Sequence, residues 1–391
     1  MLTQKEVQQL DEQYIAHTYA RYAVPLAQGS GSQCRDFNGK TYIDFGSGIG
    51  VNSLGFCDPA WAQAVAEQAR TLSHCSNYFA TEPCVLLAQE VCRRTGMSKV
   101  FFANSGAEAN EGAIKAARKY ASQKGKTGGK IVTLVNSFHG RTMTTLTATG
   151  QKEMHVDFDP FMPGFDYAQA GNLEDTFQKL DGAVAVMMEM IQGEGGVNML
   201  EKEYVTAVAD YCHAHDILII DDEVQTGAGR TGTFLCCEHY GLHPDIVTMA
   251  KGLGGGLPIG AVLLSEKVQG VFSPGSHGST FGGNPIVCAG ALAVLKQMDD
   301  AFMQAVAHKG EMMKKALLSM PGVEAVSGCG LMIGVSLKKG TAKEAAAKCL
   351  EKGLIVLTAK DKVRLLPPLN IAQEHMDAGL AILGQVLAEL A

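Results

Sequence analysis

The sequence lacks the features of proteins that bind polyanions or insert into membranes. Its formal net charge is −7, and it contains no sustained run of Lys and Arg with interleaved aromatic residues. No apolar run reaches membrane-spanning length, and residues 1–10 have neither the basic start nor the apolar stretch of a signal peptide. We therefore expect no nucleic-acid partner and no membrane association.

Patterns for disulfide bonding or metal binding are also missing. The eleven cysteines are an odd number, none forms a Cys-x-x-Cys motif, and Cys236 and Cys237 are adjacent. His213 and His215 would face different sides of a helix, and the segment between His239 and His243 is broken by glycine. We expect no metal site, and reduced, mostly buried cysteines in a cytoplasmic protein.

What is present suits a large α/β protein with more than one domain. Hydrophobic residues make up 46% of the 391 residues and charged residues 19%, enough to build more than one core. Short apolar runs alternate with helical patterns, which is typical of βαβ units with a buried, mostly parallel sheet. The predicted strands are Val100–Phe102, Ile131–Val135, Val184–Glu189, Ile217–Asp221, Ile246–Met249 and Ala261–Leu264, with helices near Ala107–Tyr120 and Tyr204–His215.

The pattern changes near residue 290. A long helical stretch runs from about Asn284 to Met303, and a smaller α+β unit with strands at Leu331–Leu337 and Val363–Leu365 follows. Near the start, Asn38-Gly39 lies between two apolar runs and favours a hairpin with a two-residue turn. We expect an N-terminal segment (1–50) that packs with the small domain, a large domain (51–290) and a C-terminal small domain (291–391).

Ligands of an open parallel sheet lie at the carboxyl ends of its strands, so polar residues after predicted strands are candidates for chemistry. Asn104–Glu108 follows a strand and opens a helix, where free N–H groups and the glycine favour phosphate binding. The simpler alternative is an ordinary helix cap. The loop His277–Pro285 is rich in hydroxyls and glycines and offers a second set of donors to a phosphate, or is only a turn.

Asp222 and Lys251 are the strongest candidates for catalysis. Asp222 ends a buried strand, where a carboxylate stays ionised only beside a cationic partner such as a pyridinium N–H. Magnesium ligation and a surface turn are the alternatives. Lys251 lies among Ala, Gly and Leu residues, where a depressed pKa and a nucleophilic amine arise. The alternative is a lysine that reaches solvent.

The segment Ser137–Arg141 follows another predicted strand. Phe138 can cover a flat heterocycle, and Arg141 can bind a carboxylate through two parallel hydrogen bonds. Core packing of Phe138 and a surface ion pair of Arg141 are the alternatives, and His139 suits a structural imidazole.

With these residues in view, the chain resembles the class III (subgroup II, fold type I) aminotransferases from end to end. The shared motifs occur in family order and spacing: Asn104–Asn110, Phe138–Arg141, Gln192–Gly196, Asp222–Gly227 and Gly283–Pro285. The resemblance implies a large domain with a mostly parallel sheet flanked by helices and a smaller α+β domain. It also implies a homodimer and pyridoxal 5'-phosphate as the cofactor.

The resemblance implies roles residue by residue. Lys251 would hold the cofactor through its amine and act as the catalytic base and acid, with Asp222 paired to the ring nitrogen. The implied cofactor contacts are Ser105, Gly106, Ala107, Phe138, Asp222, Glu223, Val224, Gln225, Lys251 and, from the other subunit, Thr280. The implied substrate contacts are Arg141, Glu194, Arg364 and, across the dimer interface, Ser279.

Two family features bear on the substrate. The residue at the position of Glu194 pairs with the second arginine while the amine donor is bound and moves away for glutamate. The segment 47–50 lacks the tyrosine that relatives acting on free ornithine have there. The resemblance therefore implies transfer of the terminal amino group of N2-acetylornithine to 2-oxoglutarate, in arginine biosynthesis. Alternatives are a related ω-aminotransferase acting on succinylornithine, ornithine, 4-aminobutyrate or lysine, an aminomutase with the same cofactor, and a non-enzymatic α/β binding protein.

Overall fold

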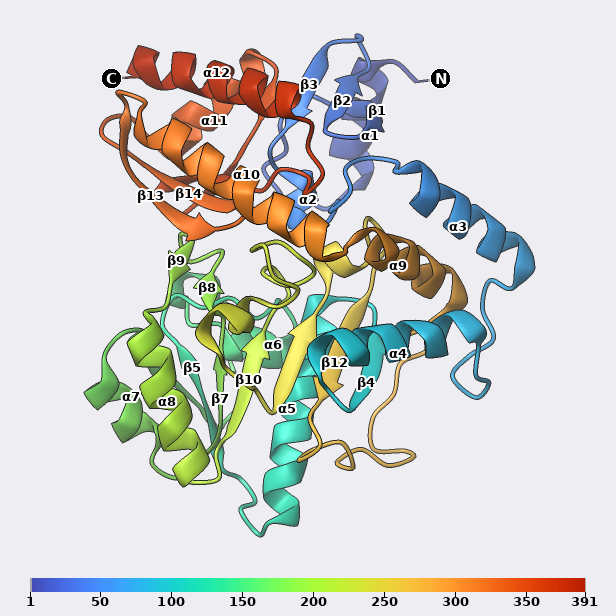
Figure 1. Ribbon diagram of the computed structural model, residues 1–391, viewed down its shortest axis with the longest axis vertical. Helices are drawn as coiled ribbons and strands as arrows, with labels where there is room; N and C mark the ends of the chain where they lie inside the picture. The colour runs from blue at the N-terminus through green and yellow to red at the C-terminus, as the bar shows by residue number, and fades with distance from the viewer. Residues whose placement is uncertain (1, 391) are drawn as a thin grey trace.

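The computed structural model describes residues 2–390, and its largest element is a central sheet (Figure 1). Within these residues seven strands lie in the order β4-β12-β11-β10-β7-β5-β6. Their bounds are β4 Lys99–Ala103, β5 Lys130–Leu134, β6 Phe165–Ala168, β7 Ala183–Met188, β10 Leu218–Asp222, β11 Ile246–Met249 and β12 Gly260–Leu264. Only β12 runs antiparallel to its neighbours, so the predicted mostly parallel sheet is confirmed.

The sheet is buried on both faces because helices cover each of them. Successive residues of a strand point to opposite faces. Leu218 and Ile220 accordingly pack in the core beneath helix α5 (Gly106–Gln123), whereas Ile219 packs in the other core with helix α8 (Lys202–Ala214). This double coverage explains why the strands read as continuous apolar runs with little alternation.

The six predicted strands and both predicted helices are present, with small shifts at their ends. Strand β6 was not predicted, because its sequence Phe-Asp-Tyr-Ala carries a charge and is only partly buried at the sheet edge. The predicted long helix after Asn284 is two helices, α9 (Pro285–Gln297) and α10 (Asp300–Leu318). The break occurs where the Asp299 side chain accepts a hydrogen bond from the N–H of Phe302 and starts the second helix.

A smaller α+β part lies above the central sheet in Figure 1 and contains both termini. Its antiparallel sheet has the order β13-β14-β17-β16. The strand bounds are β13 Val323–Cys329, β14 Met332–Leu337, β15 Leu354–Ile355, β16 Leu357–Ala359 and β17 Lys362–Leu365, and the helices are α10, α11 (Ala342–Glu351) and α12 (Gln373–Leu390). Of these strands, β13, β15 and β16 were not predicted.

Strands of the N-terminal segment join the sheet of this smaller part. Strand β3 (Thr41–Asp44) pairs in parallel with β15, and β1 (Leu26–Ser30) and β2 (Gln33–Asp36) extend the same sheet. Four residues, 37–40, separate β2 and β3, where a two-residue turn was predicted, and Gly39 adopts a positive φ (84°) in this loop. The exact domain boundaries at residues 50 and 290 stay a prediction.

The remaining elements are short strands and peripheral helices: α1 Gln4–Tyr14, α2 Ser47–Gly50, α3 Pro59–Thr71, α4 Glu82–Thr95, α6 Met143–Ala148, α7 Leu173–Leu180, β8 Ile191–Gln192 and β9 Asn198–Met199. In the part of the chain that the structure describes, no helix is long and apolar enough to cross a bilayer. The cysteines are free thiols, and more than half of them are buried.

Helix α12 offers a matched test of how the N-terminal segment is packed. A methyl group added at Gly379 would lie 2.3 Å from Cζ of Phe45, which is fully buried. At Gly384, on the same helix, the added methyl would meet Met320 at an ordinary 3.6 Å. We predict that Gly379→Ala lowers the free energy of unfolding by about 1–3 kcal/mol through overpacking. Gly384→Ala should leave it unchanged or raise it by up to about 1 kcal/mol.

Urea unfolding of the two variants followed by circular dichroism measures the difference. Equal midpoints for Gly379→Ala and Gly384→Ala would contradict the packing of Phe45 against α12.

Candidate active site

A cavity of about 470 Å³ lies at the carboxyl ends of the parallel strands. This volume is in the range of small-molecule sites, and the position is where open α/β sheets bind ligands. The polar side chains on its wall follow successive strands: Asn104 and Ser105 after β4, His139 and Arg141 after β5, Glu189 after β7, Asp222 at the end of β10 and Lys251 after β11.

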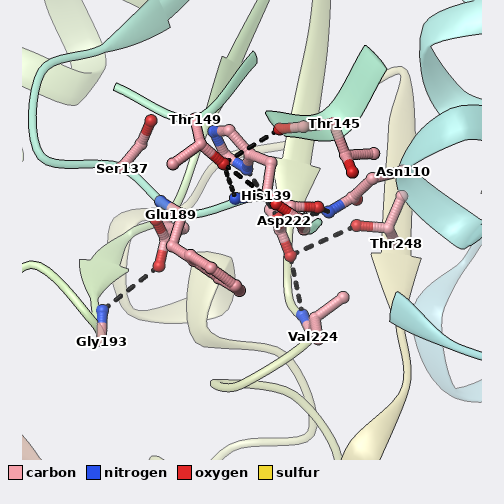
Figure 2. A network of polar contacts seen from close by, with 12 residues as sticks. Asn110, Ser137, His139, Thr145, Thr149, Glu189, Gly193, Asp222, Val224 and Thr248 are labelled. Carbon is pink, nitrogen blue, oxygen red and sulfur yellow. Dashed lines mark hydrogen bonds and ion pairs between the residues drawn. The ribbon is translucent and has the colours of Figure 1, made fainter. Parts of the chain in front are cut away.

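Asp222 is held by four donors at the base of this cavity. Its Oδ2 accepts from Asn110 Nδ2 (2.8 Å) and lies 2.7 Å from His139 Nδ1. Its Oδ1 accepts from the N–H of Val224 (3.1 Å) and, at a longer 3.4 Å, from the hydroxyl of Thr248. Figure 2 shows these groups converging on Asp222 from separate elements. Hydrogen bonds of this kind stabilise a buried carboxylate in its ionised form.

Lys251 lines the same cavity and is partly buried. It is the first residue of a short 3-10 turn, Lys251–Leu253, and has a positive φ of 40°. Such a backbone conformation costs energy in a residue with a side chain, and strain of this kind is common at functional sites. Burial lowers the pKa of Lys251, although the negative charges of Glu194 and Asp222 oppose the shift. A larger share of its amine is therefore unprotonated and nucleophilic near neutral pH.

The N-terminus of α5 forms another wall. Ser105 is the N-cap, and its hydroxyl accepts from the N–H of Glu108 (3.2 Å). The first N–H groups of a helix have no partner within it, and Gly106 and Ala107 line the cavity. Gly106 is required by packing, because a Cβ there would lie 2.6 Å from Cγ1 of Val224. The arrangement suits an anion at the helix start.

Phe138 and Arg141 lie on the wall formed by the loop after β5. The guanidinium carbon of Arg141 is 5.6 Å from the ring centroid of Phe138, and Arg141 is exposed. An exposed arginine at the mouth of a cavity can meet a carboxylate of an incoming ligand.

Arg364 and Glu194 form an ion pair beside the cavity. Arg364, on β17 of the smaller part, donates from Nη1 to Glu194 (2.6 Å) and to Oε1 of Gln225 (3.2 Å). Burial acts to raise the pKa of Glu194, but the charge and hydrogen bonds of Arg364 outweigh it, so that pKa lies below its ordinary value. The pair brings the smaller part of the fold to the edge of the site.

Three predicted site residues lie elsewhere. Thr280 lines a second, smaller cavity with Asn77 and Phe79, and Ser279 lies beside it, where its carbonyl accepts from Asn77 Nδ2 (2.8 Å). Glu223 points away from the main cavity, and its Oε1 accepts from the N–H of Cys237 (2.8 Å). The structure therefore does not bring Glu223 together with the proposed cofactor contacts.

Glu223 belongs to a buried group with Asp221 and Cys237, whose potential ligand atoms lie within 4.8 Å of one another. Burial and the charge of Glu223 raise the pKa of Asp221 well above its ordinary value. Burial also raises the pKa of Glu223 to about 7. Both acids therefore hold their protons at a higher pH than exposed carboxyl groups do.

Several residues at the site were not predicted from the sequence. Asn110 and Thr248, which bond Asp222, are neutral polar residues inside a helix and a strand. Asn110 ends the shared motif Asn104–Asn110 but was given no role, and nothing in the local sequence marks Thr248. Glu189 directly follows β7, so the rule that examines polar residues after strands would have found it. His139, expected to be structural, contacts Asp222 and lines the cavity.

The comparisons with known proteins agree with this geometry. A family model described as "Aminotransferase class-III" matches residues 14–387. The chain is 50% identical to the acetylornithine aminotransferase of Haemophilus ducreyi over the whole of both chains. It is 47% identical to that of Caldanaerobacter subterraneus subsp. tengcongensis, over 97% of this chain and 98% of the relative.

Solved structures are similar over the same length. The ornithine aminotransferase of Toxoplasma gondii, whose structure has PLP partially occupied at the active site, matches with a TM-score of 0.94 at 30% identity, over 99% of this chain and 95% of that one. The acetylornithine aminotransferase of Elizabethkingia anophelis matches with a TM-score of 0.88 at 30% identity, over 100% of both chains.

The tight contact at Gly106 generates a prediction. In Gly106→Ala the added methyl displaces Val224 from the cavity wall, and we expect pyridoxal phosphate to be retained about tenfold less tightly, equivalent to about 1.4 kcal/mol. Gly270→Ala, where an added methyl meets nothing within 4 Å, is the control.

Absorbance titration of the cofactor-free variants with pyridoxal phosphate measures the affinities. An unchanged affinity in Gly106→Ala would show that Val224 and the helix start do not contact the cofactor.

Proposed function

The chain belongs to the class-III aminotransferases, and we propose that it moves the terminal amino group of N2-acetylornithine to 2-oxoglutarate, giving N-acetylglutamate 5-semialdehyde and glutamate. The observation that carries the reaction type is that a partly buried lysine, Lys251, and a buried carboxylate, Asp222, lie on the wall of one cavity. The named relatives support the amine donor, and this reaction belongs to arginine biosynthesis.

The residues present fit pyridoxal 5'-phosphate. The N–H groups of Gly106 and Ala107 and the hydroxyl of Ser105 would hold its phosphate, and Phe138 and Val224 would lie against its ring. Asp222 would pair with the ring nitrogen, and Gln225 would donate to the phenolic oxygen. When bound, the cofactor supplies a sink for the electrons that a broken bond to the substrate carbon leaves behind.

The chain's own residues then orient the substrate and move protons. Asp222 keeps a negative charge at the base of the cavity, where its four donors hold it in place. With its pKa lowered by burial, the amine of Lys251 would take the proton from the substrate carbon that carries the amino group. The protonated Lys251 would then deliver that proton to the carbon that receives the amino group.

Arg141 and Arg364 divide the recognition of the two substrates. Arg141 would bind a carboxylate common to both substrates. Arg364 is neutralised by Glu194 in the present geometry, which suits an amine donor with no second carboxylate. If Glu194 turns away, Arg364 becomes free for the second carboxylate of 2-oxoglutarate, so that one site serves both substrates.

We also propose a homodimer in which each active site receives residues from the partner. Ser279 and Thr280 lie away from the main cavity of their own chain, and large aromatic side chains near them are exposed: Tyr78 by 95%, Phe79 by 70% and Phe281 by 60%. Exposed aromatic clusters of this kind mark protein interfaces.

The free cysteines support a reducing, cytoplasmic location.

Free ornithine is the second candidate donor, because solved ornithine aminotransferases match the whole fold. The segment Ser47–Gly50 offers no tyrosine hydroxyl or carboxylate to its α-ammonium group. That charge would then be desolvated without a partner, whereas the acetyl amide carries none.

A panel of donors tests the assignment. With 2-oxoglutarate as acceptor, we expect kcat/KM for N2-acetylornithine to exceed that for ornithine and 4-aminobutyrate by about tenfold or more. Production of the aldehyde, measured for each donor, gives the values, and succinylornithine serves as the matched acylated control. A higher kcat/KM for ornithine than for both acylated donors would overturn the substrate assignment.

A further inference from the structure

Glu189 is a buried carboxylate at the cavity for which the reaction described above has no role. It follows β7 directly, is only 5% exposed and lines the cavity. A buried carboxylate is costly unless its oxygens are satisfied. The hydrogen-bond partners of the Glu189 carboxylate therefore indicate why this position has an acidic residue.

Both oxygens of Glu189 accept hydrogen bonds from backbone N–H groups of different loops. Oε1 accepts from the N–H of Phe138 at 2.7 Å, and Oε2 accepts from the N–H of Gly193 at 3.2 Å. Figure 2 shows the bond from Gly193 reaching Glu189 beside His139 and Asp222. One side chain thus ties the loop that carries the aromatic wall to the turn that carries Glu194.

The turn at Gly193 is tightly packed as well as hydrogen-bonded. A Cβ on Gly193 would lie 2.4 Å from Oε1 of Gln225, and Gln225 in turn bonds both Glu194 and Arg364. These contacts fix the backbone of Gly193, so that Glu194 is expected to leave Arg364 by rotation of its side chain. Without the bond from Gly193 to Glu189, we expect the turn to move toward Arg364 and keep the ion pair closed.

We propose that Glu189 is a positioning residue, which fixes the backbone of Gly193 relative to Phe138 and thereby sets how readily Glu194 releases Arg364 for a dicarboxylate substrate. This inference rests on the proposed function for the role of Glu194, but the two hydrogen bonds of Glu189 do not depend on it.

The charged groups that face Glu189 make the contact sensitive to pH. They are His139 from the loop after β5, Asp222 from β10 and Lys251 after β11. Burial raises the pKa of Glu189 to about 7; His139 opposes the shift and Asp222 adds to it. Below that pKa one oxygen carries a proton and turns a donor toward an N–H group, so one of the two bonds is lost.

Glu189→Gln reproduces the protonated acid at every pH, because an amide has one acceptor oxygen for two N–H donors. We expect the oxygen to keep the shorter bond to Phe138 and the bond to Gly193 to be lost. The KM for 2-oxoglutarate should rise about tenfold, within the range expected for a buried donor left unsatisfied, while the KM for the amine donor stays within about twofold. The wild-type KM for 2-oxoglutarate should rise below about pH 7, and that of Glu189→Gln should not change there.

Hydrogen exchange gives a readout that needs no activity. In the full-length protein, exchange at the amide of Gly193 should be about tenfold faster in Glu189→Gln than in the wild type, and exchange at Phe138 should be little changed. Glu238→Gln is the matched control, because Glu238 also accepts from a backbone N–H, that of Leu235, outside the site. It should alter neither the kinetics nor the exchange at Gly193. Glu189→Asp keeps two acceptor oxygens, so its KM for 2-oxoglutarate should lie between those of the wild type and Glu189→Gln.

Two results would overturn the proposal. One is an unchanged exchange rate at Gly193 in Glu189→Gln. The other is an equal effect of that variant on both substrates, since a general loss of structure would produce it. Failure of the wild type to transfer amino groups from any donor would instead refute the proposed function, and the exchange experiment would still decide whether Glu189 holds the turn.

Discussion

The structure depends on keeping a carboxylate, Asp222, buried at the end of a strand, on the wall of a cavity that the amine-bearing Lys251 also lines. Taking either group out of water alone is unfavourable, and each needs a compensating environment. For Asp222 that environment is a set of four donors from α5, the loop after β5, β11 and its own turn. The carboxyl ends of β5, β10 and β11 lie at the same edge of the sheet, so these donors meet at Asp222.

The smaller part of the fold carries Arg364, for which we propose substrate binding, and its position relative to Asp222 must be fixed. Arg230, from the large part, is almost completely buried and donates to the carbonyls of Leu331 and Pro367. Leu331 lies just before β14, and Pro367 lies just after β17, the strand that carries Arg364. Burial lowers the pKa of Arg230 to about 9, and the charge of Asp44 opposes the shift. Buried polar contacts between the two parts therefore set where Arg364 meets Glu194, and a small displacement there would alter which substrate the site accepts.

Much of this arrangement could be predicted from the sequence, for physical reasons that differ between elements. Strands such as β7 and β10 were predicted because strands buried on both faces consist of continuous apolar residues. Asp222 and Lys251 were predicted because a polar residue is conspicuous at the end of such an apolar run. Strand β6 and the short strands of the smaller part were missed, because partly exposed strands carry mixed sequences. Glu223 was assigned to the cofactor through its motif, yet alternation along the chain turns it to the opposite side from Asp222. The bonds of Asn110 and Thr248 depend on tertiary contacts that no local pattern encodes.

The central claim is that one lysine, Lys251, holds the cofactor opposite Asp222. Borohydride reduction of the cofactor-loaded protein fixes pyridoxal phosphate permanently to the amine that carries it, and peptide mass mapping then identifies the residue. The account predicts a single labelled peptide with the added mass on Lys251. A label on any other lysine, or no label in a protein that retains its visible absorption, would contradict it.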